Sequence, residues 1–549
     1  MKVTDAVASV LTDLGADTVF GVVGSGNFHV TNALIARGAR YVAARHECGA
    51  ASMADGWARL TARPALLSLH QGPGITNALT GITEAAKSRT PLVVLAADVS
   101  ASALTSNFRI DVAAMTAATG ATPARLHSTA FAVDDAARAY RLARDERRTV
   151  VLALPLDVQA SECSWPGPPD ARPAAPLPPR PLQVAELVHA LAAASRPVFI
   201  AGRGARSWAA RAELQRLGDA CGALLATSAA AKGLFRGNPW DLDVSGGFAS
   251  PLAAELIGGA DVLVAWGCSL NMWTTRHGSL IGPDSMVVQV DVDERAIGAH
   301  RPVKFGVVGD VGLTAAAVAD QLVELNGEHT AGYRSAELAD RLKVGIRWRD
   351  VPFDDASDGD RIDPRSLSIA LDDMLPGDRI VAVDSGNFMG YPSMFLSVPD
   401  QDGFCFTQAY QSVGLGLASA IGSAIARPDR LVIAALGDGG ALMGISELET
   451  AVRLALPMVI VVYDDEAYGA EVHHFGPDGY PLDTVRFPAA DLAAIARGYG
   501  CDAVTVRSVA DLAPVREWLD ARPPHPILID ARVVSDRGSW WLEEAFRGH

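Results

Sequence analysis

The sequence predicts an α/β protein made of three doubly wound domains, each with a parallel sheet. The chain has 549 residues, and at about 150 residues per domain this length suggests three or four domains. Short apolar runs of strand length end in turns and alternate with helix-like segments along most of the chain, a pattern typical of parallel sheets covered by helices. Hydrophobic residues at 49% and charged residues at 20% are those of an ordinary globular protein.

Two breaks in composition divide the chain. The segment 165–181 contains eight prolines, too many for a helix or an interior strand, so we predict an extended, semi-rigid linker. The segment 326–363 is mixed and partly acidic, which indicates an exposed connector around one helix. We therefore predict domains at 1–164, 182–325 and 364–549.

The first domain opens with an amphipathic helix and a strand in MKVTDAVASVLTDLGADTVFGV. Ser25 follows in the turn GVVGSGNFHV, and Glu47 precedes the helix-like run CGAASMADGWARL. His70 ends the apolar strand ARPALLSLH, directly before the turn Gln71-Gly72-Pro73-Gly74. Three polar side chains are therefore expected near the ends of strands in this domain.

The central domain contains three apolar strands that each end in a turn, within RPVFIAGRGA, ADVLVAWGCSL and MVVQVDVDERAIG. Gly202-Arg203-Gly204 and the acids Asp291 and Asp293 could belong to a dinucleotide-binding fold. The full G-x-G-x-x-G pattern fails because Ser207 stands at its last position. A flavin or nicotinamide oxidoreductase is accordingly the alternative from another enzyme class.

The third domain contains a predicted holder for a metal diphosphate, from Leu431 to Gly469. An apolar strand leads into Gly437-Asp438-Gly439, then come a helix, a second apolar strand and an acidic turn with Asp465. Both carboxylates are expected at the carboxyl edge of one sheet, where ligands of open α/β folds bind. Hard oxygen ligands suit Mg²⁺, which shares its coordination with substrate phosphates.

Charge and composition exclude several other classes. A formal net charge of −16 argues against a nucleic-acid partner, which would need a basic face. The six cysteines form no close pair, so neither a zinc site nor a disulfide framework is indicated. We find no apolar run of membrane-spanning length and no secretory leader at the amino terminus, and therefore expect a cytoplasmic protein with no membrane partner.

The segment 431–469 resembles the thiamine-diphosphate-dependent enzymes, whose signature is GDG, a spacer and a closing Asn-Asn. Here Gly437-Asp438-Gly439 is followed by Asp464-Asp465, so an extra negative charge replaces the usual amide. The resemblance implies Mg²⁺ and thiamine diphosphate as cofactors. It implies as metal ligands Asp438, Asp465 and the carbonyl of Ala467, and as cofactor-binding residues Gly437, Asp438, Gly439, Gly440, Val413 and Tyr468.

The same resemblance covers the first domain as the pyrimidine-binding domain, with Glu47 as the activating acid. That chemistry needs a protonated carboxyl beside N1′ of the aminopyrimidine, so that the imino form can remove the C2 proton. Val413 matches the residue that bends the cofactor, which a side chain stiff at χ1 can do; ordinary helix packing is the alternative for it. In this family Glu47 of one subunit meets the diphosphate site of another, which implies a homodimer or homotetramer.

Further features resemble the decarboxylases of the family. His70 and Ser25 match catalytic and substrate-binding positions of benzoylformate-decarboxylase-like members. Glu471 matches an acid of pyruvate-decarboxylase-like members that helps protonate the enamine. For His70 a structural role is the alternative, and for His473 and His474 a surface or helix-cap role is preferred.

The broadest resemblance is to the acetolactate-synthase branch, in domain order and in the D-x-D element at Asp291. It departs at the acceptor site, because Arg109 follows Phe108 where that branch has Gln, and Trp273 replaces its Arg. Arg276 lies nearby in a different register. A bound FAD, which that branch carries in the central domain, stays possible.

We therefore expect an acetolactate-synthase-like enzyme that decarboxylates a 2-oxo acid and then releases an aldehyde or transfers the product to a second carbonyl. A 2-oxo acid and an aldehyde or ketone acceptor are its expected small-molecule partners. Acetolactate synthase proper and a benzaldehyde-lyase-type carboligase are the alternatives within the family.

Overall fold

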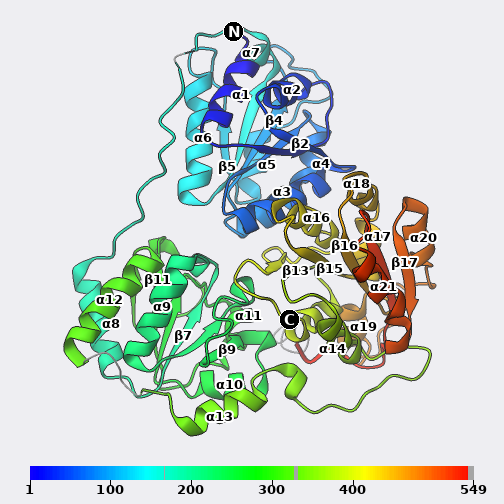
Figure 1. The fold of residues 1–549 in the computed structure, drawn as a ribbon. Coiled ribbons are helices and arrows are strands. Elements are labelled where there is room, and N and C mark those ends of the chain that lie inside the picture. Colours follow the sequence, from blue (N-terminus) through cyan, green and yellow to red (C-terminus); the bar gives the residue numbers. More distant parts are fainter. Residues whose placement is uncertain (166, 327–331, 542–549) are drawn as a thin grey trace.

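The computed structural model describes residues 1–165, 167–326 and 332–541, and contains three six-stranded sheets. Every pairing between neighbouring strands in these sheets is parallel. Helices pack on both faces of each sheet (Figure 1). The predicted fold class is therefore confirmed. None of the described helices is long and apolar enough to cross a membrane.

The first sheet contains the strands β1 (Thr18–Gly21), β2 (Arg40–Ala43), β3 (Ala65–Leu69), β4 (Leu92–Asp98), β5 (Thr122–Arg125) and β6 (Thr149–Pro155). Its helices are α1 (Val3–Asp13), α2 (Phe28–Ala36), α3 (Glu47–Thr61), α4 (Pro73–Lys87), α5 (Val112–Ala118), α6 (Ala132–Glu146) and α7 (Leu156–Ala160). The strand order is β2-β1-β3-β4-β6-β5. Helices α3 and α4 cover one face of this sheet, while α1 and α6 cover the other.

The third sheet contains the strands β13 (Arg379–Val383), β14 (Phe404–Phe406), β15 (Leu431–Gly437), β16 (Met458–Asp464), β17 (Asp502–Val506) and β18 (Ile527–Arg532). Its helices are α14 (Pro364–Met374), α15 (Gly390–Phe395), α16 (Gly416–Ala426), α17 (Asp438–Met443), α18 (Glu447–Arg453), α19 (Gly469–Phe475), α20 (Leu492–Tyr499) and α21 (Ala513–Ala521). The order β14-β13-β15-β16-β18-β17 repeats that of the first sheet strand for strand. The two domains thus share one topology, although their sequences show no visible repeat.

The central sheet contains the strands β7 (Pro197–Ala201), β8 (Leu224–Thr227), β9 (Asp241–Val244), β10 (Val262–Trp266), β11 (Met286–Asp291) and β12 (Phe305–Val308). Its helices are α8 (Pro181–Ala192), α9 (Trp208–Cys221), α10 (Pro251–Gly258), α11 (Met272–Thr275) and α12 (Val311–Asn326). The three strands predicted from the sequence correspond to β7, β10 and β11. The order β12-β11-β10-β7-β8-β9 is that of a dinucleotide-binding fold.

The predicted linker and connector differ in character. Between α7 and α8 the described residues form an extended crossing without helix or long strand (Figure 1). The connector carries one helix, α13 (Ala336–Gly345), but Leu338 and Leu342 are buried against the central domain. That helix is therefore part of the central domain's packing. Residues 327–331 and 542–549, which fall in the predicted connector and third domain, lie outside the described residues, and the exact boundaries stay predictions.

The first and third domains share one apolar core. Helices α3 and α16 cross closely: a β-carbon on Gly56 would overlap the carbonyl of Ser419, and one on Gly422 would overlap the carbonyl of Met53. Glycine permits this backbone approach because it has no side chain. The start of α3, where Glu47 lies, is therefore fixed relative to the third domain of the same chain.

Candidate active site

Asp438 and Asp465 come together at the carboxyl ends of β15 and β16. Asp438 is the first residue of α17, directly after β15, and Asp465 directly follows β16. Burial, together with the charges of Asp465 and Asp464, raises the pKa of Asp438 to about 8, and burial raises the pKa of Asp465 to about 6. Buried carboxylates that repel each other are stabilised by a cation.

The site therefore fits Mg²⁺ bound jointly by the protein and a diphosphate. Among the described residues no cluster of three or more His, Cys, Asp or Glu side chains could hold a metal alone. Two carboxylates and a backbone carbonyl, such as that of Ala467, leave coordination positions for phosphate oxygens.

The turn that contains Gly439 and Gly440 accepts no side chain. A β-carbon on Gly439 would lie 2.7 Å from the ring of Tyr468, and one on Gly440 would lie 3.1 Å from Val413 Cγ1. Val413 and Tyr468, each 37% exposed, thus flank the start of α17. The structure thus brings Val413 and Tyr468 to the glycines of α17, and Glu471 lies on α19, the helix that follows the acidic turn.

Two residues of this site were missed from the sequence, Asp384 and Asn387, both in the loop after β13. Asp384 is fully buried and accepts hydrogen bonds from the backbone amides of Gly414 at 2.9 Å and Leu415 at 3.2 Å. Asp384 thereby fixes the turn that presents Val413. The position of β13 beside β15 marks the topological switch point of the sheet, where ligands bind. The only local signal in the sequence was that Asp384 directly follows an apolar strand.

Asn387 supports the second carboxylate. Its Nδ2 donates to Asp465 Oδ2 at 3.3 Å, while Ser539 Oγ donates to its Oδ1 at 2.9 Å and Trp541 Nε1 to its carbonyl at 3.2 Å. The amide of Asn387 is therefore held by the segment after β18 and directed toward Asp465.

The first acid of the unusual Asp-Asp pair has a partner of its own. Arg532, at the end of β18, contacts Asp464 at 3.0 Å, Asp530 at 2.9 Å and Glu466 at 3.1 Å. One guanidinium is shared by three carboxylates, so Arg532 offsets the additional charge of Asp464 only in part, and that charge still raises the pKa of Asp438.

Ser25, Glu47 and His70 lie at the corresponding edge of the first sheet, after β1, β2 and β3. The amide of Gly26 donates to His70 Nδ1 at 3.1 Å, which favours the neutral tautomer with its proton on Nε2. Burial lowers the pKa of His70. Asn77 Nδ2 donates to Glu47 Oε2 at 3.0 Å. The Ser25 turn and His70 are thus joined at the β1/β3 switch point.

Within the described part of one chain, no hydrogen bond or ion pair joins Glu47, His70 or Ser25 to Asp438 or Asp465. Glu47 is half-buried in the single chain, so its own chain does not provide the apolar enclosure that the activating acid needs. The two halves of the predicted site thus share no direct polar contact of these residues among the described residues.

A cavity of about 190 Å³ lies beside the acidic turn. Its lining includes Asp465, Ala467, His473, Arg486 and Ser535. Burial lowers the pKa of His473. His473, for which the sequence favoured a surface or cap role, therefore lies beside the proposed metal ligands.

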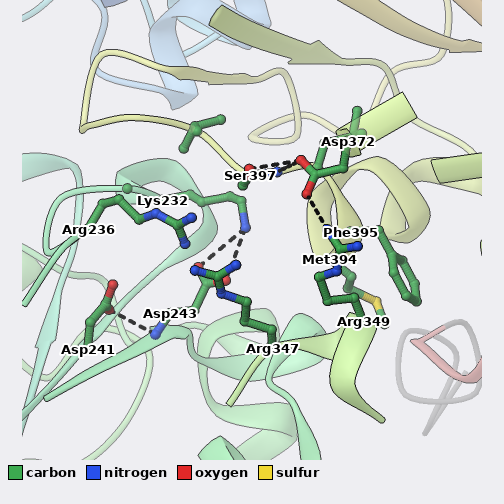
Figure 2. A pocket seen from close by; sticks show the side chains of 13 residues that line it. Lys232, Arg236, Asp241, Asp243, Arg347, Arg349, Asp372, Met394, Phe395 and Ser397 are labelled. Carbon is green, nitrogen blue, oxygen red and sulfur yellow. Dashed lines mark hydrogen bonds and ion pairs between the residues drawn. The ribbon is translucent and has the colours of Figure 1, made fainter. Parts of the chain in front are cut away.

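A second cavity lies between the central and third domains and contains none of the predicted site residues (Figure 2). Its volume is about 30 Å³. Lys232 Nζ contacts both carboxylate oxygens of Asp243 at 3.3 Å, and the amide of Asp243 donates to Asp241 at 2.9 Å. The groups are charged, but the small volume and their mutual pairing indicate an interdomain contact.

Asp241 should make the stability of the protein depend on pH. Burial and the charge of Asp243 raise its pKa to about 7, above the unfolded value of about 4. The protonated carboxyl of Asp241 contributes fully to the free energy of unfolding below pH 4. This contribution is lost as the pH rises through 7, because the unfolded state releases the proton at a lower pH than the folded state does. We expect Asp241→Asn to raise Tm at pH 8 by roughly 2–4 °C and to leave it unchanged at pH 4. Scanning calorimetry at both pH values, with the exposed Asp483→Asn as control, checks this, and parallel profiles for parent and variant would contradict it.

The central domain's dinucleotide elements do not fit a bound flavin. A β-carbon on Gly202 or Gly204 would overlap or crowd Gly267, so the backbones at the switch point of this sheet are in contact. Arg89, from the first domain, contacts Asp291 at 3.4 Å and Asp293 at 3.1 Å. The turn that a dinucleotide would use is thus closed, and the acids are already paired with Arg89.

Arg276, the alternative acceptor arginine, bonds to the backbone. Its Nε donates to the carbonyl of Gly246 at 2.9 Å and its Nη2 to that of Ala249 at 2.7 Å, while its guanidinium lies 4.6 Å from the centre of the Trp540 ring. These contacts hold Arg276 between the central domain and the segment after β18.

Comparison with known proteins agrees with this geometry. Three profiles of the thiamine pyrophosphate enzyme family match the chain: the N-terminal TPP binding domain over residues 1–121, the central domain over 184–318 and the C-terminal TPP binding domain over 384–531. They match the three domains in order, although the first profile ends before β5 and β6 and the third begins after β13.

Curated relatives extend over nearly the whole chain. A probable 2-ketoarginine decarboxylase of Pseudomonas aeruginosa is 31% identical over 94% of this chain and 91% of its own length. A sulfoacetaldehyde acetyltransferase of Castellaniella defragrans is 27% identical over 95% of this chain and 91% of its own length. An acetolactate synthase large subunit of Parasynechococcus marenigrum is 28% identical over 96% of this chain and 87% of its own length. The chain therefore belongs to the thiamine pyrophosphate enzyme family and carries out thiamine-diphosphate-dependent chemistry on 2-oxo acids.

Proposed function

We propose that this protein decarboxylates a 2-oxo acid and releases the product as an aldehyde, with Mg²⁺ and thiamine diphosphate as cofactors. The observation that carries the proposal is a proton-handling side chain on each half of the site. His70 is held by the amide of Gly26, and Glu471 lies on α19, which begins four residues after Asp465 (469 − 465). Release of an aldehyde requires a proton donor, whereas carboligation requires an acceptor carbonyl instead.

When bound, thiamine diphosphate supplies a carbon nucleophile at C2 and a sink for the electron pair that CO₂ leaves behind. Asp438, Asp465 and the carbonyl of Ala467 would hold the cation that offsets the diphosphate charge. Val413, fixed by Asp384, would support the bend of the cofactor. Glu47 of a second copy would hold the proton at N1′ of the pyrimidine. This division of labour requires a homodimer or homotetramer, which the half-exposed position of Glu47 in one chain supports.

The relatives suggest where to look for the substrate. The relative at 31% identity is named a 2-ketoarginine decarboxylase, so we place 2-oxo acids with long polar side chains first. Carboligation of the acetolactate-synthase type is the second candidate, favoured by the relative at 28% identity. Against it stands Arg276, whose guanidinium is bonded to backbone carbonyls. The six free cysteines support a cytoplasmic, reducing setting.

Mass spectrometry of the products from a panel of 2-oxo acids, including 2-ketoarginine and pyruvate, with and without added aldehydes, tests the proposal. We expect CO₂ and one aldehyde. A coupled product in place of the aldehyde would favour the carboligase. NAD(P)H turnover without CO₂ release would overturn the proposal in favour of an oxidoreductase.

The proton donors can be tested separately. We expect His70→Ala or Glu471→Gln to slow aldehyde release by about 10²-fold, at the low end of general acid catalysis, and to slow CO₂ release less, because protonation follows decarboxylation. Rapid-quench measurement of both products, with the exposed His189→Ala as control, separates the two steps. If both variants release aldehyde as fast as the parent, neither side chain is the donor.

A further inference from the structure

Helix α18 of the third domain reaches the chain segment directly before Glu47 in the first domain. Glu447, at the start of α18, is 2% exposed. Its Oε1 accepts hydrogen bonds from the backbone amides of Arg45 at 3.1 Å and His46 at 3.0 Å, and Thr450 Oγ1 donates to its Oε2 at 2.7 Å. A buried carboxylate is thus satisfied chiefly by the backbone of another domain.

Two further side chains of α18 bind the same segment. Glu449 Oε2 accepts from Arg45 Nε at 2.6 Å, and Arg453 Nη2 donates to the carbonyl of Ala43 at 2.6 Å. We call residues 43–46 the activator turn and Glu447, Glu449 and Arg453 the α18 clamp. The clamp bonds to residues at both ends of the turn that leads into Glu47.

The contact at Glu447 is specific in shape as well as in charge. A β-carbon on Gly49, in the first turn of α3, would overlap Glu447 Oε1. Glycine is a poor helix former, so its presence in α3 is explained by the carboxylate that occupies the space. Burying a carboxylate is favourable only where its lone pairs are satisfied, which three donors achieve here.

The clamp is continuous with the proposed metal site. Asp438 is the first residue of α17. The amide of Gly444 donates to the carbonyl of Gly440 at 3.3 Å, and the amide of Glu447 donates to the carbonyl of Gly444 at 3.0 Å. The backbone that holds the cation therefore leads within one short segment to the side chain that holds the activator turn.

We propose that Glu447 is a positioning residue, which aims Glu47 through the activator turn and links it to the diphosphate-site helix of the same chain. This inference rests on the proposed function, in which Glu47 serves the site of a second copy. The α18 clamp then connects the metal site of one active centre with the activating acid of the other. Domain adhesion alone would not require a carboxylate directed at the amides that precede Glu47.

Two variants weaken the contact from opposite sides. Glu447→Gln keeps the size of the side chain but replaces the charged acceptor of the two backbone amides with a neutral amide oxygen, which binds them more weakly. Gly49→Ala leaves Glu447 intact but displaces it, while improving the intrinsic helix propensity of α3. The matched controls are Glu517→Gln, at an exposed position, and Gly498→Ala, a helical glycine with open space around it.

Three measurements are made on the full-length protein. Amide hydrogen exchange by mass spectrometry reports on residues 43–46 without cofactor, calorimetry gives the affinity for thiamine diphosphate with Mg²⁺, and quenched NMR gives the exchange rate of the cofactor's C2 proton. In both variants we expect amide exchange and C2 exchange to change by about 10- to 100-fold, as for residues that orient a functional group. Amide exchange becomes faster, C2 exchange becomes slower, and affinity stays within about threefold.

C2 exchange equal to the parent, alongside faster amide exchange, would reduce the clamp to domain packing and overturn the inference. Unchanged amide exchange in Glu447→Gln would do so as well. A parent protein that binds no thiamine diphosphate would refute the proposed function together with the coupling. The amide measurement, made without cofactor, distinguishes that failure from a failure of the clamp.

Discussion

Asp438→Ala is expected to abolish retention of thiamine diphosphate, with affinity weakened by about 100-fold or more. Asp438 and Asp465 repel each other in a partly buried site, and burial together with this repulsion raises the pKa of Asp438 to about 8. Removing Asp438 takes away one of two side-chain ligands, so the remaining groups bind Mg²⁺ poorly and the diphosphate charge is no longer offset. Calorimetric titration with Mg²⁺ and thiamine diphosphate measures the loss.

The matched variant is Asp465→Asn, which restores the residue type usual in the family and keeps an oxygen ligand and the Asn387 contact. We expect it to bind the cofactor. Asp520→Ala, at an exposed position of α21, controls for the loss of a carboxylate. Since a ligand stabilises the state that binds it, Tm should rise with cofactor in the parent and in both of these variants. Undiminished binding by Asp438→Ala would remove Asp438 from the metal site.

Glu47→Gln is expected to bind thiamine diphosphate nearly as well as the parent and to exchange the C2 proton about 10⁴-fold more slowly, at the upper end of general acid–base catalysis. The amide oxygen can still accept from Asn77 Nδ2, which donates to Glu47 Oε2 at 3.0 Å. The amide cannot, however, exchange a proton with N1′ of the pyrimidine. Quenched hydrogen–deuterium exchange at C2, followed by NMR, gives the two rates.

The comparison needs a control for folding and assembly, because the proposed site forms between two copies of the chain. Analytical ultracentrifugation of Glu47→Gln should give the oligomeric state of the parent, and Glu517→Gln should exchange the C2 proton at the parental rate. Equal C2 exchange in the parent and Glu47→Gln would exclude Glu47 as the activating acid.

Local sequence patterns determined the fold class and the identity of the main site. The apolar runs that became β7, β10, β11, β15 and β16 could be recognised because a buried parallel strand needs apolar residues on both faces. The Gly-Asp-Gly turn and the acids after β16 could be located because adjacent parallel strands bring their carboxyl ends to one edge. These features depend on residues close together in the chain, and the family profiles confirm the family, while the roles of the site residues stay predictions.

Only the tertiary structure showed which partners complete the site. Asp384 and Asn387 join it because β13 pairs beside β15, an order that no short segment of sequence records. Arg532 pairs with Asp464, and Glu447 binds the turn before Glu47, across separations of 68 and 401 residues, respectively (532 − 464 and 447 − 46). The first contact follows from the pairing of β16 with β18, and the second follows from the packing of the first domain against the third, in particular α3 against α16. A sequence pattern therefore indicates which side chains carry the chemistry, while the fold decides which charges and amides hold them in place.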